Sequence, residues 1–161
     1  EFTLHTFADH IMGGTHIALT MGEVSAEEPT LVRVHIANTL RDVCGVVNPV
    51  WPSWSFSTAL ARIAKEGRGV AVLLSGDEYA ENINETLVAA FGDEAGAPRQ
   101  NRKGNDLTIG TGSQILRDLG VGKMRLLSYP ARFHAISGFD LEVVDFVPFD
   151  EKFGQDLPSV E

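Results

Sequence analysis

The stretch FSTALARIAKEGRGVAVLL, residues 56–74, decides the fold. Four apolar side chains recur in it at the spacing of one helix face: Phe56, Ala59, Leu60 and Ile63. Ser53 or Ser55 can cap the start of this helix, and the glycines of GRG end it. The continuous apolar run VAVLL, residues 70–74, then follows as a strand buried on both faces. A helix that leads into such a strand predicts an α/β (α+β) domain with a helix-covered sheet.

On the N-terminal side, residues 2–8, 15–22 and 31–36 alternate apolar and polar side chains. This period of two is typical of half-buried strands. The first third of the chain therefore predicts three or more strands in a small barrel or sheet. The remainder predicts a mixed sheet flanked by helices.

On the C-terminal side, the same patterns predict a helix at residues 83–91, a helix from about Gly112 to Gly120, and strands at residues 124–128 and 141–147. Residues 92–105 are rich in Gly, Asn and charges, so we expect a long loop that is the most mobile internal segment. Residues 1–149 are expected to form one domain, and residues 150–161 a polar tail.

Composition excludes several functional classes. The formal charge of the 161-residue chain is −9, and no predicted helix carries a basic face, so we expect no nucleic-acid partner. No apolar stretch approaches the roughly 18 residues that span a bilayer, so we expect no membrane association and a cytoplasmic protein. The single cysteine, Cys44, excludes an internal disulfide. Its thiol is predicted to be buried and inert, with a reactive nucleophile as the alternative.

Three segments resemble the GTP cyclohydrolase II family of riboflavin biosynthesis: LARIAKEGRGV at 60–70, GSQILRDLGVGKMRLL at 112–127, and SGFDLEVVDFVP at 137–148. The early pieces HIALTMGE and LVRVH also match. The resemblance implies the family fold and a homodimer. In this family, zinc-bound water opens the imidazole ring of GTP and releases formate, with loss of pyrophosphate.

The resemblance also shows where this chain departs from the family. The family holds zinc with three cysteines in the pattern C-x10-C-x-C, beginning just after R-V-H. Here R-V-H is Arg33 to His35, the first cysteine position is Asn38, and residues 48–52 read NPVWP. The five histidines show no HxH or HxxxH spacing. We therefore expect no metal ligands, no zinc and no other cofactor.

The family's other catalytic motifs are altered as well. Its R-Q-E-G-R-G-I-G-L segment corresponds to SGDEYAENINE at 75–85, which has acids and no arginine. These acids would repel a triphosphate, or they form a solvated helix start. The catalytic D-x-R falls on Asn105 and Leu107, with Asp106 as a surviving acid if the alignment shifts by one residue. We expect no catalytic residues.

Some ligand-binding positions keep their chemical type. Arg33, Ser128 and Arg132 are predicted as vestigial ligand-binding residues, because the family contacts nucleotide there; a structural ion pair is the alternative for Arg33. IGTG at 109–112 opens a predicted helix and could seat a phosphate on backbone N–H groups. Trp51 and Trp54, in the segment that replaces the zinc loop, either pack the vacated space or form an interface.

These observations predict a catalytically degenerate domain. The resemblance and the absence of an initiator Met suggest the C-terminal half of a fusion with dihydroxybutanone phosphate synthase, in which this half stabilises, dimerises or regulates the synthase. The alternatives are a sensor that binds a nucleotide or flavin, and a cyclohydrolase that still acts on GTP.

Overall fold

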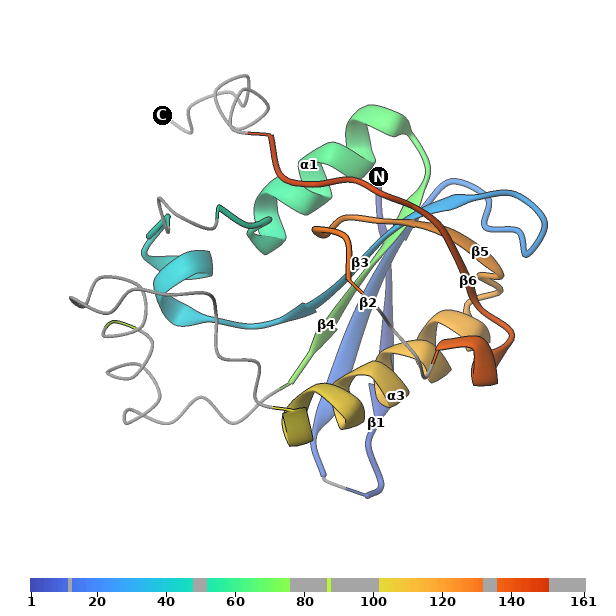
Figure 1. The fold of residues 1–161 in the computed structure, drawn as a ribbon, viewed down its shortest axis with the longest axis horizontal. Coiled ribbons are helices and arrows are strands. Elements are labelled where there is room, and N and C mark those ends of the chain that lie inside the picture. Colours follow the sequence, from blue (N-terminus) through green and yellow to red (C-terminus); the bar gives the residue numbers. More distant parts are fainter. Residues whose placement is uncertain (12, 48–51, 76–86, 88–101, 132–135, 151–161) are drawn as a thin grey trace.

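A computed structural model describes residues 1–11, 13–47, 52–75, 87, 102–131 and 136–150, with the backbone alone at 102–108 and 137 (Figure 1). Within these residues one six-stranded mixed sheet forms the centre of the fold, in the order β1-β2-β4-β3-β5-β6. The strands are β1 (Thr3–Ala8), β2 (Thr15–Met21), β3 (Thr30–Ile36), β4 (Gly69–Leu74), β5 (Lys123–Leu126) and β6 (Glu142–Phe146). The α/β class predicted from the sequence is confirmed, and the N-terminal strands join the common sheet rather than a barrel.

The sheet changes direction at β4. The pairs β1–β2 and β2–β4 are antiparallel, whereas β3 pairs in parallel with both β4 and β5, and β5 pairs in parallel with β6. Strand β4 lies between β2 and β3, and five of its six residues are buried. The apolar run VAVLL thus occupies the central position that its composition predicts.

Helices α1 (Phe56–Glu66) and α3 (Arg102–Asp118) cover opposite faces of this sheet (Figure 1). Successive strand residues point to opposite faces. Leu31 and Ala71 belong to the apolar cluster that contains Ile63 of α1, whereas their neighbours Val32 and Val72 belong to the cluster that contains Ile115 of α3.

Helix α1 begins and ends where the sequence indicates. The Ser55 hydroxyl accepts a hydrogen bond from Thr58 N, which selects Ser55 over Ser53 as the cap. Gly67 ends the helix in the left-handed conformation, with φ 81°. Gly69 allows close packing, because a Cβ there would lie 2.7 Å from the carbonyl oxygen of Leu31.

Helix α3 begins at Arg102, ten residues before the predicted start at Gly112. The predicted loop at 92–105 is therefore wrong at residues 102–105, and its remainder lies outside the described residues. Once the packed turns around Ile115 and Leu116 exist, each added residue gains a backbone hydrogen bond without a new nucleation step. Such propagation overrides the weak propensities of Gly104 and its polar neighbours.

The other predictions differ by one or two residues. Strand β5 ends at Leu126 because Ser128 N turns back to donate to Leu126 O at 2.8 Å. The helix predicted at 83–91 lies outside the described residues except at Leu87, which is helical. The tail beyond residue 150 also lies outside them. The described residues also include two short helical turns, the π-helical η1 (Thr39–Val43) and the 3-10 helix η2 (Ile136–Phe139).

Candidate functional site

Arg33, a predicted ligand-binding residue, lies on β3 and is partly buried among carbonyl groups of its own chain. Its Nη1 donates to Leu127 O at 2.7 Å and its Nη2 to Trp54 O at 3.2 Å. Burial, followed by the nearby charge of Arg41, lowers the pKa of Arg33 to about 10, so it stays a cation at neutral pH. The guanidinium thereby links β3 to the residue after β5, Leu127, and to the segment before α1, at Trp54.

Ser128 follows β5 directly after Leu127, the residue whose carbonyl Arg33 contacts. The fold therefore brings Arg33 close to the backbone beside Ser128. Arg132 lies outside the described residues. A ligand-binding role for these three residues stays a prediction.

The turn that follows β3 contains a cluster of hydrogen bonds centred on Asp42. Two groups donate to Oδ1, Phe56 N at 3.1 Å and Arg41 Nε at 3.2 Å. Three donate to Oδ2: His35 Nε2 at 2.8 Å, Asn38 N at 2.8 Å and Arg41 Nη2 at 3.2 Å. Burial opposes ionisation of Asp42, but the hydrogen bonds from Arg41, His35 and the two backbone amides outweigh it. They hold the pKa of this carboxyl well below its usual range.

His35 completes the cluster as a neutral imidazole. Its side chain is fully buried, and burial lowers the pKa of His35 to about 4 despite the opposing hydrogen bond with Asp42. Nδ1 accepts from Arg33 Nε at 3.2 Å, which assigns the ring proton to Nε2. Arg41 Nη2 also lies 3.0 Å from His35 Nε2, but both atoms are donors, so this approach reflects their shared acceptor, Asp42.

Asn38, the described residue at the first expected zinc-ligand position, does not fit a zinc site of three thiolates. The side-chain oxygen of Asn38 accepts from Arg41 N at 2.9 Å and caps η1. Both carboxylate oxygens of Asp42 are engaged as described. Within the described ranges, no three His, Cys, Asp or Glu side chains converge in a way that could hold a metal ion.

Cys44 is exposed, so the prediction of a buried thiol is wrong. It is the residue that ends η1, and its N–H donates to Thr39 O at 3.0 Å. No residue of η1 is buried, so a thiol at the end of this turn lies at the surface whatever its apolar character. One exposed thiolate cannot replace three zinc ligands.

Trp54 is 2% exposed and packs against α1. Its indole Nε1 donates to Val147 O at 2.9 Å, and its ring meets the edge of Phe149 at a centroid distance of 5.2 Å. The packing interpretation is confirmed for Trp54. Trp51 lies outside the described residues.

The phosphate seat predicted at Ile109–Gly112 is not present, because these residues lie in the middle of α3 rather than at its start. Their N–H groups are used inside the helix. Gly112 instead permits close contact between α3 and β3, since a Cβ there would lie 2.9 Å from Cγ1 of Val34. The prediction of a phosphate seat is wrong because α3 begins at Arg102, before these residues.

The structure also brings together the side chains of Ser75, His16 and Asp9, which the sequence analysis did not single out. Ser75 Oγ lies 3.2 Å from His16 Nδ1, and His16 Nε2 lies 3.3 Å from Asp9 Oδ2. The order of groups resembles a nucleophile, base and acid. However, Ser75 N also donates to the same Nδ1, at 3.0 Å, and so occupies the lone pair that a base would need. We interpret this series of hydrogen bonds as a structural link between β4 and the β1–β2 hairpin.

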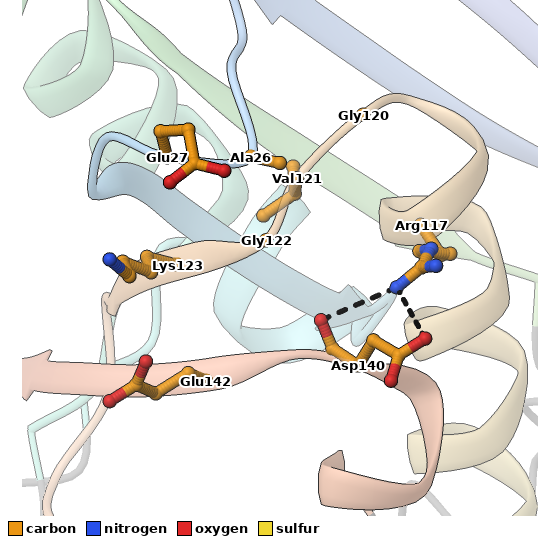
Figure 2. Close-up of a pocket in the computed structure, with 9 residues that line it drawn as sticks. All are labelled: Ala26, Glu27, Arg117, Gly120, Val121, Gly122, Lys123, Asp140 and Glu142. Atoms are coloured by element: carbon orange, nitrogen blue, oxygen red, sulfur yellow. Dashed lines mark hydrogen bonds and ion pairs between the residues drawn. The ribbon is translucent and has the colours of Figure 1, made fainter.

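A hollow of about 400 Å³ lies at the amino ends of β5 and β6, beside the end of α3 (Figure 2). It is lined by Ala26, Glu27, Arg117, Gly120, Val121, Gly122, Lys123, Asp140 and Glu142. Arg117 pairs with Asp140 at 3.0 Å, and both side chains are more than half exposed. Ligands in open α/β sheets bind at the carboxyl ends of strands, where Ile36 and Leu126 lie, so this hollow is at the opposite end.

Comparison with known proteins identifies the family to which this fold belongs. Residues 1–148 match the family model described as GTP cyclohydrolase II, and the chain belongs to that family. It is 48% identical over 152 residues to a 3,4-dihydroxy-2-butanone 4-phosphate synthase of Pseudomonas aeruginosa, covering 92% of this chain and 40% of that protein. It is 39% identical over 156 residues to the riboflavin biosynthesis protein RibBA of Aquifex aeolicus, covering 91% and 38%.

A solved structure agrees with this assignment. The crystal structure of RibBX, a two-domain 3,4-dihydroxy-2-butanone 4-phosphate synthase from A. baumannii, is similar with a TM-score of 0.55 and 32% identity. The match covers 93% of this chain and 40% of that one. The chain thus spans about two fifths of the length of the proteins it matches. Across the described parts of the chain, no helix combines the length and apolarity needed to cross a bilayer.

Proposed function

We propose that this chain is a catalytically degenerate GTP cyclohydrolase II domain that acts as a structural or regulatory partner of a dihydroxybutanone phosphate synthase domain in the same polypeptide. The proposal includes a homodimer, a cytoplasmic location and the absence of zinc and of nucleic-acid binding. The relatives named as synthases support it, because this chain matches only part of their length.

The observation that best supports the proposed loss of cyclohydrolase activity is the cluster of hydrogen bonds around Asp42. In the family, zinc supplies a Lewis acid that lowers the pKa of a bound water. Here the turn where that metal is expected has Asn38 in place of the first cysteine, and its amide oxygen is committed to a cap. The carboxylate of Asp42 accepts hydrogen bonds from five donor atoms. Asn38 cannot supply the thiolate that the family uses at this position, and the oxygens of Asp42 are already occupied by hydrogen bonds.

The neighbouring groups do not offer an obvious replacement for acid–base chemistry. His35 is buried, with Nδ1 accepting from Arg33 and Nε2 donating to Asp42. A general base needs an accessible lone pair within hydrogen-bond reach of substrate. The cluster therefore has the properties of a structural element.

Two measurements test the loss of activity. Elemental analysis of the purified protein should find no stoichiometric zinc, and incubation with GTP and added zinc or magnesium should release no formate. One zinc per chain after mild chelation, or turnover that follows the protein through gel filtration and is abolished by Arg33→Ala, would contradict the proposal.

The partner role needs the whole polypeptide. Full-length protein and the synthase half alone are compared for conversion of ribulose 5-phosphate, melting temperature and mass in solution. We expect removal of this domain to change at least one of the three. Identical behaviour would leave the partner role unsupported and would favour the alternative, a sensor of a nucleotide or flavin, which isothermal calorimetry with GTP, FMN and riboflavin detects.

A further inference from the structure

The two outer strands of the sheet differ in how they are protected. Within the described residues, β1 and β6 are the edges of the sheet, since each pairs with a single neighbour. We propose that β1 is the interface of the homodimer, where it pairs in antiparallel fashion with β1 of a second copy and joins the two sheets into one. The inference rests on the proposed homodimer and adds the surface through which the copies meet.

The backbone of β1 directs a row of hydrogen-bonding groups away from β2. Asp9 N donates to Gly14 O at 3.1 Å at the hairpin end of the pair, so the backbone of Asp9 faces β2. In an antiparallel pair, successive residues alternate between facing the partner strand and facing away from it. The register of β1 with β2 is regular over all six residues of the strand, so the N–H and C=O groups of Leu4, Thr6 and Ala8 point to the free edge. Another strand can pair there.

A second copy of the same strand fits this edge through a two-fold axis. An axis perpendicular to the sheet at Thr6 places two identical strands antiparallel, so that each outward donor meets an acceptor of the other copy. Thr6 then lies opposite Thr6 of the second copy, and Leu4 lies opposite Ala8. Only residues with outward backbone groups exchange hydrogen bonds in this register, and all three of these residues belong to that set.

The distribution of charge favours this edge over the other. The chain carries a formal net charge of −9, so two copies repel each other on average. Residues 2–8 contain no Asp, Glu, Lys or Arg, and an axis at Thr6 places Asp9 opposite an uncharged residue of the other copy. Strand β6, by contrast, carries Glu142 and Asp145 and has a shift in its register with β5. Charges and irregular registers are features that keep an edge strand from pairing.

The side chains beside the β1 edge are apolar. Leu4 is 60% exposed and lies opposite Leu19 of β2. Leu19 in turn lies opposite Ala71, whose cluster contains Ile63 of α1, so these side chains share the sheet face that α1 covers. Neither leucine belongs to the two core clusters of the described residues. In the dimer, Ala8 of the second copy extends this apolar strip, so pairing removes Leu4 from water while it satisfies the backbone groups.

The test measures the mass of the 161-residue chain by sedimentation over a range of concentrations. We expect the parent to be a dimer and Thr6→Lys to raise its dissociation constant by about tenfold, because the axis would place two ammonium groups directly opposite each other. Val144→Lys, on the other edge and at a side chain that is 43% exposed, should leave the dissociation constant unchanged. Thr6→Glu should weaken the dimer as Thr6→Lys does. An equimolar mixture of the two Thr6 variants should form mixed dimers, since opposite charges then meet at the axis.

Amide exchange locates the interface without a substitution. The N–H groups of Thr6 and Ala8 should exchange slowly in the concentrated parent protein and faster on dilution, whereas exchange at Val144 should not depend on concentration. A dimer of equal strength in Thr6→Lys and Val144→Lys would overturn the β1 interface and leave the proposed homodimer and loss of zinc intact. A chain that is monomeric at every concentration would overturn the homodimer as well. Protection of these amides only in the full-length polypeptide would assign the edge to the synthase half instead.

Discussion

His35 donates from Nε2 to Oδ2 of Asp42 across 2.8 Å, with the imidazole fully buried and the Asp42 side chain 14% exposed. In this pair His35 is neutral and Asp42 is ionised. Burial of the ring disfavours a second proton on the imidazole more strongly than the carboxylate favours it. This balance makes stability depend on pH in a defined range.

The first prediction concerns that range. The folded-state pKa of His35 is about 4 and its ordinary value is 6.5, so between these values the unfolded chain binds a proton that the folded chain does not. The free energy of unfolding should therefore be at its full value above pH 6.5 and fall as the pH is lowered toward 4, by at most about 3 kcal/mol from this group.

Urea unfolding at several pH values between 7.5 and 4.5 measures this loss. His35→Gln should flatten the dependence, whereas His10→Gln, at an exposed position, should leave it unchanged. A dependence that persists equally in both variants would show that another group is responsible.

The second prediction uses two glycines of α3 as a matched pair. Gly112→Ala places a methyl group 2.9 Å from Cγ1 of Val34 and should destabilise by about 1–3 kcal/mol. Gly110→Ala meets no atom within 4 Å and should stabilise by about 0.5–1 kcal/mol through helix propensity. Thermal unfolding of the two variants should therefore shift in opposite directions. Shifts of the same sign would mean that α3 does not pack on β3 as described.

The third prediction concerns the guanidinium of Arg33. Arg33→Met leaves the carbonyl oxygens of Leu127 and Trp54 without this donor and should destabilise by about 2–4 kcal/mol. Arg68→Met removes a half-buried arginine whose partner, Glu28, is exposed, and should change stability by less than about 1 kcal/mol. Urea unfolding measures the free energy of unfolding of both variants. Equal, small effects would favour the vestigial ligand-binding role over the structural one.

The fourth prediction concerns Trp54. Trp54→Phe removes the donor to Val147 O and leaves space beside Phe149, so the free energy of unfolding should fall by about 1–3 kcal/mol. Tyr129→Phe, at a partly exposed ring, should have little effect. Chemical unfolding followed by circular dichroism checks both. An unchanged midpoint for Trp54→Phe would imply that the indole does not anchor the segment after β6.

Local sequence determined the elements whose patterns are strong. The run at 70–74 predicted a buried strand, the serines at 53 and 55 and the glycines of GRG bracketed the ends of α1, and the family segments indicated the fold. These features depend on neighbours a few residues apart, which is the range over which periodicity and capping act. The absence of cysteine at position 38 was likewise readable without coordinates.

Only the tertiary structure decided where α3 begins and which distant side chains meet. Helix α3 is anchored in the core at Ile115 and Leu116, and it extends back to Arg102 by propagation, which overrides the loop-like composition around Gly104. The Asp42 cluster joins residues 35 to 56, and the Ser75–His16 link joins residues 59 positions apart. No spacing rule marks such pairs, because their hydrogen bonds form only once the sheet brings the strand ends together. The sequence by itself thus determined the family and the absence of the family's cysteines from this chain, and the folded chain decided which side chains hold the turn after β3.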